Sequence, residues 1–157
     1  MFTVNLFTKD NTPVDISLRD ICQYNGIETA LKMATYLDST HNKDLRLFAV
    51  WCARQVQHLM TDTRCLKGLD VAERFANGEV TQEELGEAQI MVWKASESTG
   101  FDNVAHSAYC AVFHNINDAV SYAAHNAARA INDTERTKQT EMFIRMCEGT
   151  APWQLKD

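Results

Sequence analysis

The stretch KDLRLFAVWCARQVQHL, residues 43–59, decides the fold of this chain. Leu47, Val50 and Trp51 make one side of a predicted helix apolar, and the opposite side carries a second apolar stripe with spacings of three and four. That stripe consists of Leu45, Phe48, Ala49, Cys52, Val56 and Leu59. A helix that is apolar on two sides packs between other elements, so we expect this helix at the centre of a helical domain.

Capping signals predict further helices on both sides of this segment. Ser17 begins a helix that Gly26 ends, and Thr81 begins another in which Glu84 completes a capping box. The longest helix is predicted from residue 102 or 103 to about residue 131. Because the connections are short, we expect neighbouring helices to be antiparallel. The sequence therefore predicts an all-α fold, an antiparallel bundle of about six helices.

The N-terminal residues 1–16 show the strand signal of the chain. Phe2, Val4 and Leu6 alternate with polar residues, and a turn-like segment follows at residues 9–13. This pattern predicts a small β-hairpin. Two strands alone are marginally stable in water, so we expect the hairpin to lie on the helices or to pair with another chain.

Length and composition favour one domain. The 157 residues, 45% hydrophobic and 23% charged, match a globular protein with a single core, and no linker divides the chain. We therefore interpret residues 1–157 as a single helical domain. Residues 150–157 are predicted to form a loose tail in which Trp153 is the anchor.

The cysteines and the apolar segments indicate a cytoplasmic protein. The five cysteines form no C-x-x-C pair, which is untypical of a disulfide framework or a zinc knuckle, and Cys52 and Cys65 fall on apolar stripes as core thiols. The first residues lack the pattern of a secretion signal, and no stretch approaches 18 apolar residues. We therefore expect no membrane partner.

The net charge of −6 bears on the class of partner. The 15 basic and 21 acidic side chains are scattered along the chain, so the overall field repels a nucleic-acid backbone and direct nucleic-acid binding is not expected. An acidic surface remains compatible with a basic protein partner. It also fits ordinary solubility.

A block from Leu45 to about Ala88 resembles a known family. It contains LRLFAVWCAR at 45–54, HLM at 58–60 and VAERFANGEVTQEEL at 71–85. These segments are similar to predicted immunity-protein-like domains, Ala-rich helical proteins of bacteria and phages. The resemblance implies a helical protein that binds and neutralises another protein, such as a toxin or a defence factor. It does not imply catalysis.

The later helices depart from the pattern of that family. Polar residues interrupt the alanine-rich segments at His106, Cys110, His114, Asn117 and Asn126. Surfaces that bind partners can diverge while a helical frame persists. The identity of a shared partner is therefore open.

Four potential metal ligands recur every four residues on the predicted longest helix. They are His106, Cys110, His114 and Asp118, and adjacent pairs at this spacing can share a metal ion. The first and the last are ~18 Å apart along a helix axis, so the four cannot bind one ion. At most one adjacent pair could do so, with further ligands from elsewhere.

The helical wheel predicts which side of this helix faces the core. The core stripe consists of Ala105, Tyr109, Val112, Ile116, Ala119, Ala123, Ala127 and Ala130. The opposite, polar face consists of Cys110, His114, Asn117, Asp118, Ser121 and His125. We consider three interpretations of this face: a solvated surface, a partner-binding surface and a metal site.

A second polar strip is predicted near the end of the central helix. Arg54, His58 and Asp62 follow at intervals of four, so a cation, an imidazole and a carboxylate could line one strip. A histidine held by a carboxylate can act as a general base, but no nucleophile or phosphate loop accompanies it. The alternative is a structural arginine and histidine that join two helices. For partner binding this is the preferred anchor region, with Trp51 beside it.

The sequence therefore favours a non-enzymatic, intracellular protein-binding module of inhibitor or immunity type, without cofactor or catalytic residues. A phage-encoded protein is compatible with this interpretation, and host or phage origin is left open. The candidate partner-binding residues are Trp51, Arg54, His58, His114, Asn117, Asp118 and His125. One alternative is a small metal-binding protein or metal-assisted hydrolase. Another is a structural or oligomer-forming protein, such as a component of a virion. A homo-oligomer is compatible with the sequence.

Overall fold

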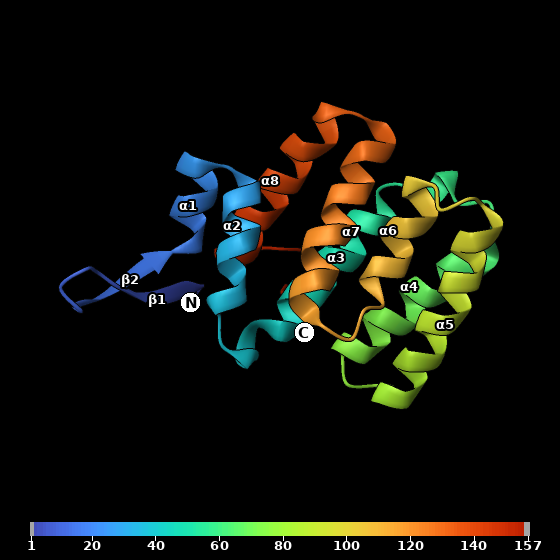
Figure 1. Ribbon diagram of the computed structural model, residues 1–157, viewed down its shortest axis with the longest axis horizontal. Coiled ribbons are helices and arrows are strands. Elements are labelled where there is room, and N and C mark those ends of the chain that lie inside the picture. Colours follow the sequence, from blue (N-terminus) through green and yellow to red (C-terminus); the bar gives the residue numbers. More distant parts are fainter. Residues whose placement is uncertain (1, 156–157) are drawn as a thin grey trace.

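Helix α3 (Asn42–Arg54) lies at the centre of the computed structural model, which describes residues 2–155. Every residue from Leu45 to Val50 is buried, so both sides of α3 face other elements. It packs against four helices, α4 (Thr63–Ala76), α6 (Asn103–Ala111), α7 (Ile116–Ile131) and α8 (Asp133–Cys147) (Figure 1). The predicted central position is confirmed. The helix ends at Arg54, earlier than expected, and a 3-10 turn follows at Gln57–Leu59.

The remaining helices cover two ends of this centre. Helix α5 (Gln82–Ser98) packs on α4 and α6, at the end of the molecule opposite the hairpin (Figure 1). Helices α1 (Leu18–Asn25) and α2 (Ile27–Met33) pack on each other and on α8, followed by 3-10 turns at Ala34–Tyr36 and Ser39–His41. The all-α fold is confirmed. The described part of the chain contains eight α-helices, more than the six or so expected.

The capping residues read from the sequence begin the helices as predicted. The Ser17 hydroxyl accepts a hydrogen bond from the Asp20 amide at the start of α1. Thr81 and Glu84 form the complete capping box of α5, because each side chain accepts from the backbone amide of the other. These bonds satisfy amides that a helix start leaves free. Gly26, with φ of 90°, follows α1.

The predicted hairpin is present as strands β1 (Thr3–Phe7) and β2 (Pro13–Ser17). They pair antiparallel, with Val4 opposite Ile16. Val4 is buried against the helices, whereas the turn end of both strands is exposed and extends from the helical body (Figure 1). The hairpin therefore lies on the helices at its base alone.

The prediction of one long helix over residues 102–131 is wrong. Helix α6 ends at Ala111 and α7 begins at Ile116, and the two helices pack against each other. The buried Arg46 of α3 donates from its guanidinium to the carbonyls of Ala111, Phe113 and His114, at 3.0, 2.6 and 3.2 Å. We call residues 112–115, which connect α6 to α7, the corner. The corner is stable because a cation satisfies carbonyls at the end of a helix, where the helix dipole is negative.

The tail is held on the helical body over its described part, rather than loose as predicted. The Trp153 indole donates to Asp44 Oδ1 at 3.0 Å, and the Gln154 amide donates to the Met146 carbonyl at 2.9 Å. Ala151 is buried. Trp153 is thus an anchor, as expected, and residues 156–157 lie outside the described residues.

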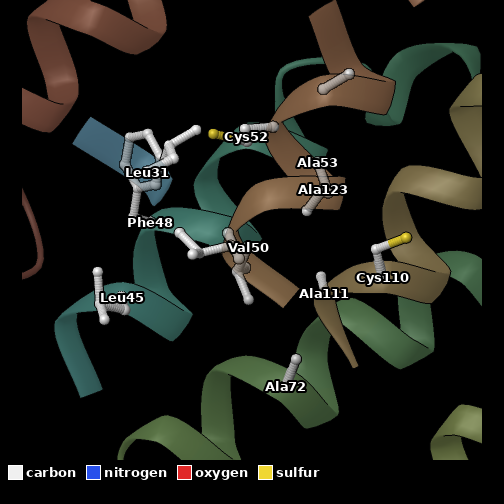
Figure 2. Close-up of a cluster of buried hydrophobic side chains, with 14 of the residues drawn as sticks. Leu31, Leu45, Phe48, Val50, Cys52, Ala53, Ala72, Cys110, Ala111 and Ala123 are labelled. Atoms are coloured by element: carbon white, nitrogen blue, oxygen red, sulfur yellow. The ribbon is translucent and has the colours of Figure 1, made fainter. Parts of the chain in front are cut away.

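The core combines a few large side chains with many small ones. Figure 2 shows the larger side chains Phe48 and Val50 of α3 in one buried cluster with the small side chains Ala111 of α6 and Ala123 of α7. Small residues let helix backbones approach closely. Gly68 of α4 is the tightest case, because a Cβ added there would overlap Cγ2 of Val92 on α5.

Candidate partner-binding surface

The four potential metal ligands do not form one face. Cys110 is 1% exposed and lies against Asn126 of α7, whose amide is 3.8 Å from its sulfur, so its expected place on the polar outer face is wrong. Burial raises the pKa of this thiol to about 12. His106 lies on α6, His114 in the corner and Asp118 on α7. Among the side chains that the structure describes, no three histidine, cysteine or acidic side chains lie close enough together to hold a metal ion.

The predicted residues His114, Asn117 and Asp118 surround the start of α7. The amides of Asn117 and Asp118 donate to the Asn115 side chain, which caps the helix, at 2.9 and 3.3 Å. The His114 ring lies 3.1 Å from the amide nitrogen of Gln82 on α5. These residues lie together, and the structure gives their backbone a role in forming the corner.

His125 lies apart from that group, in a groove between α2, α7 and α8. The exposed Tyr122 also lines this groove. At its edge the Arg136 guanidinium donates to the Glu28 carboxylate at 3.1 Å, and this ion pair lowers the pKa of Glu28. The groove has a volume of about 280 Å³ and a largely apolar lining. It offers room for a small apolar group, with its arginine already paired.

Trp51 and Arg54 do lie together, in a cleft that Trp153 of the tail also lines. The Arg54 guanidinium donates to Asp70 and Glu73 of α4, at 2.9 Å in each case. It therefore joins α3 to α4, which is the structural role considered as the alternative. Trp51 is half-buried beside Phe48.

The predicted strip of Arg54, His58 and Asp62 does not form. His58 is exposed on the 3-10 turn that follows α3. Asp62 caps α4 and pairs with Arg64 at 2.6 Å, and this hydrogen-bonded pair lowers the pKa of Asp62 to about 2. Residues four positions apart share a face within a helix, but α3 ends at Arg54. His58 and Asp62 therefore do not lie on the same face as Arg54.

A cluster of apolar side chains lies on the outer side of α5 and α6. We call it the α5–α6 surface; it consists of the exposed Ile90 and Trp93 of α5, the exposed Phe101 of the connection and the half-buried Tyr109 of α6. Ile90 is 60% exposed, Phe101 46% and Trp93 39%. The Trp93 ring centre lies 5.0 Å from that of Phe101 and 5.1 Å from that of Tyr109. Three chain segments thus combine into one apolar surface.

The connection between α5 and α6 holds Phe101 in its exposed position. Phe101 has φ of 58°, in the left-handed region, which bulky residues rarely adopt. Its amide donates to the Ser96 carbonyl at 2.8 Å and closes the end of α5. The backbone is strained at a residue whose ring faces solvent, and such strain concentrates at functional positions.

The sequence contained a signal for this surface. The buried stripe of α5 consists of Leu85, Ala88, Val92 and Ala95. Ile90 and Trp93 lie off that stripe, so an apolar residue at either position predicts exposure or a second contact. The contribution of Phe101 and Tyr109 depends on the tertiary fold.

Comparison of the chain with protein families, with curated proteins and with solved structures finds no match in any of the three. Of the helices described, none combines the length and the apolar character needed to cross a bilayer. The candidate site therefore stands on its own geometry.

Proposed function

We propose that this protein is a non-enzymatic binding module of inhibitor or immunity type, and that it contacts its protein partner through the α5–α6 surface. The observation that carries the proposal is the exposure of Ile90, Trp93 and Phe101 side by side. Contiguous apolar side chains on a surface mark interaction sites, whereas single ones are ordinary. A cytoplasmic setting belongs to the same proposal, in keeping with five free cysteines.

The chemistry of the surface suits protein recognition. Tryptophan and tyrosine are enriched among the residues that dominate binding energy, because they bury a large area at a small cost in side-chain entropy. Trp93 packs between two other rings, so its position is restrained before a partner arrives. A preordered side chain loses less entropy on binding.

The test is affinity capture from the native host, followed by cross-linking to locate the contact. Ile90→Ala and Trp93→Ala should each weaken a captured complex by at least tenfold, because both remove a central apolar contact. Tyr36→Ala is the matched control, since Tyr36 is exposed and lies on a different element. Its affinity should stay within twofold of the unmodified protein.

The thermal midpoint of each variant shows whether the fold is retained. If both alanine variants remain folded and bind the partner normally, the proposal is wrong. Cross-links confined to the cleft of Trp51 and Arg54 would contradict it in the same way. That result would return the contact to the region that the sequence favoured.

A further inference from the structure

The α5–α6 surface contains a groove of about 490 Å³. Ile90 and Trp93 line it from α5, and Tyr109 lines it from α6. Gly86 forms the rest of its lining together with Gln89. The groove is mainly apolar and open to solvent, so a large apolar side chain of another molecule would find both room and contact there.

Gly86 lies within α5, and nothing in the described chain requires a glycine at this position. A Cβ added to Gly86 would meet no atom within 4 Å. Gly68 is the contrast, since its Cβ would overlap Val92. Glycine within a helix is destabilising relative to alanine. The missing side chain at residue 86 therefore serves the open groove rather than the packing of this fold.

Acidic side chains surround the groove. Residues 82–102 carry five acidic residues and one lysine, a net charge of −4 out of the −6 of the whole chain. Glu83, Glu87 and Glu97 are exposed and form no ion pair within the described residues. Each lies three or four residues from a lining residue, which places it on the same side of α5. Lys94 lies four residues after Ile90, so this side carries three carboxylates and one ammonium group and remains acidic.

This distribution of charge selects among the possible occupants. A second copy of the chain would bring the glutamates of two α5 helices together, and like charges at an interface are strongly unfavourable. A nucleic acid would be repelled for the same reason. A segment with lysine or arginine at its edge could instead form ion pairs with the three carboxylates of Glu83, Glu87 and Glu97.

We infer that the partner contributes a basic amphipathic segment, which inserts one large apolar side chain into the groove beside Gly86. This inference rests on the proposed function and gives the partner its chemistry. The apolar residues supply the contact, and the carboxylates of Glu83, Glu87 and Glu97 favour a partner segment whose edges carry lysine or arginine. The helix-in-groove mode of recognition has these two components.

The test uses the full chain and three synthetic helical peptides of equal length. The peptides share one apolar face of leucine and tryptophan, and their polar positions are lysine, glutamine or glutamate. In titrations followed by fluorescence anisotropy, the lysine peptide should bind at least tenfold more tightly than the glutamine peptide and weaken with added salt. Equal binding of the lysine and glutamine peptides, or tighter binding of the glutamate peptide, overturns the inference.

Variants of the protein locate the bound peptide. Gly86→Leu fills the groove and should weaken the lysine peptide by at least tenfold while the protein stays folded. Glu83→Gln combined with Glu97→Gln should weaken it severalfold and reduce its salt dependence. Glu141→Gln on α8 is the control, since Glu141 is exposed outside the groove. A loss equal to that of the double variant would indicate unspecific charge attraction and overturn the inference.

Two further results separate this inference from the proposed function. If Trp93→Ala releases a natural partner that Gly86→Leu still binds, the groove is not occupied and the inference alone fails. If the natural partner is cross-linked away from α5 and α6, the proposed function fails. A concentration-dependent dimer that Ile90→Ala abolishes would assign the surface to a second copy, against the inference.

Discussion

The guanidinium of Arg46 donates a hydrogen bond of 2.6 Å to the carbonyl of Phe113, 67 residues later in the chain. Two more of its bonds go to the carbonyls of Ala111 and His114. Arg46 is buried, and burial lowers the pKa of its guanidinium to about 10, so it keeps its charge at neutral pH. A buried cation is stable here because three carbonyls face it.

Replacing Arg46 should therefore destabilise the whole domain. Arg46→Met keeps the unbranched apolar part of the side chain but leaves three carbonyls without their donor, and we expect a loss of about 3 kcal/mol or more in the free energy of unfolding. Urea denaturation measures it. Arg129→Met, at an exposed position of α7, should change the same quantity by less than about 0.5 kcal/mol. Equal losses in both variants would contradict this account of the corner.

Gly68 and Gly86 should respond in opposite ways to the same change. Gly68→Ala places a methyl group against Val92 and should destabilise by about 1–3 kcal/mol, whereas Gly86→Ala should stabilise by about 0.5–1 kcal/mol. Thermal unfolding of both variants measures the difference. Val92→Ala should partly restore Gly68→Ala, and strictly additive effects of those two substitutions would contradict the close approach of α4 and α5.

Glu135 should make stability depend on pH. Its side chain is buried, Oε1 finds no hydrogen-bond partner in the described part of the chain, and burial raises its pKa. The folded state then binds the proton more tightly than the unfolded state. Stability from this group is present below its unfolded pKa of about 4.5 and is lost as the pH rises through the folded pKa.

Glu135→Gln removes that dependence. At pH 7 the variant should be more stable than the unmodified protein by about 1 kcal/mol, and the difference should shrink as the pH falls towards 4. Urea titrations at several pH values measure it. The exposed Glu141→Gln should show no such trend, and a gain for Glu135→Gln that grows at low pH would reverse the assigned sign.

The thiols should be unreactive in the folded protein. Burial raises the pKa of Cys22 and Cys65 to about 11 and that of Cys110 to about 12. The thiolate is the reactive form, so these groups are protonated at pH 8. With a disulfide reagent we expect less than one fast equivalent in the native state and five in urea. Two or more fast equivalents without denaturant would contradict the burial of these side chains.

Local sequence signals predicted the starts of α1 and α5 correctly, but they did not predict the break between α6 and α7. Thr81 and Ser17 each cap a helix by accepting from the amide three positions later, so their effect is visible in the sequence. The corner depends on Arg46, which belongs to a distant segment. Between α6 and α7 the apolar stripe continues from Val112 to Ile116 without proline or glycine, which is typical of an unbroken helix. Capping by Asn115 was the one local signal.

The candidate surface was missed for a related reason. Trp93, Phe101 and Tyr109 come from three segments, so their grouping is visible in the fold alone. Tyr109 by itself falls on the stripe that the helical wheel assigned to the core. Trp51 was chosen for the binding surface from its helical position, and it lies half-buried in a cleft that Trp153 also lines. How far an aromatic residue is exposed depends on what packs near it, and part of the surroundings of Trp51 comes from the opposite end of the chain.

The bonds of Arg46 also have a consequence for the order of folding. They join residues 65 to 68 positions apart, so the corner can form only after the chain has closed a long loop. Until then, the apolar stripe over residues 103–131 is compatible with one straight helix. We therefore expect the bend between α6 and α7 to become stable late in folding, when α3 meets this segment.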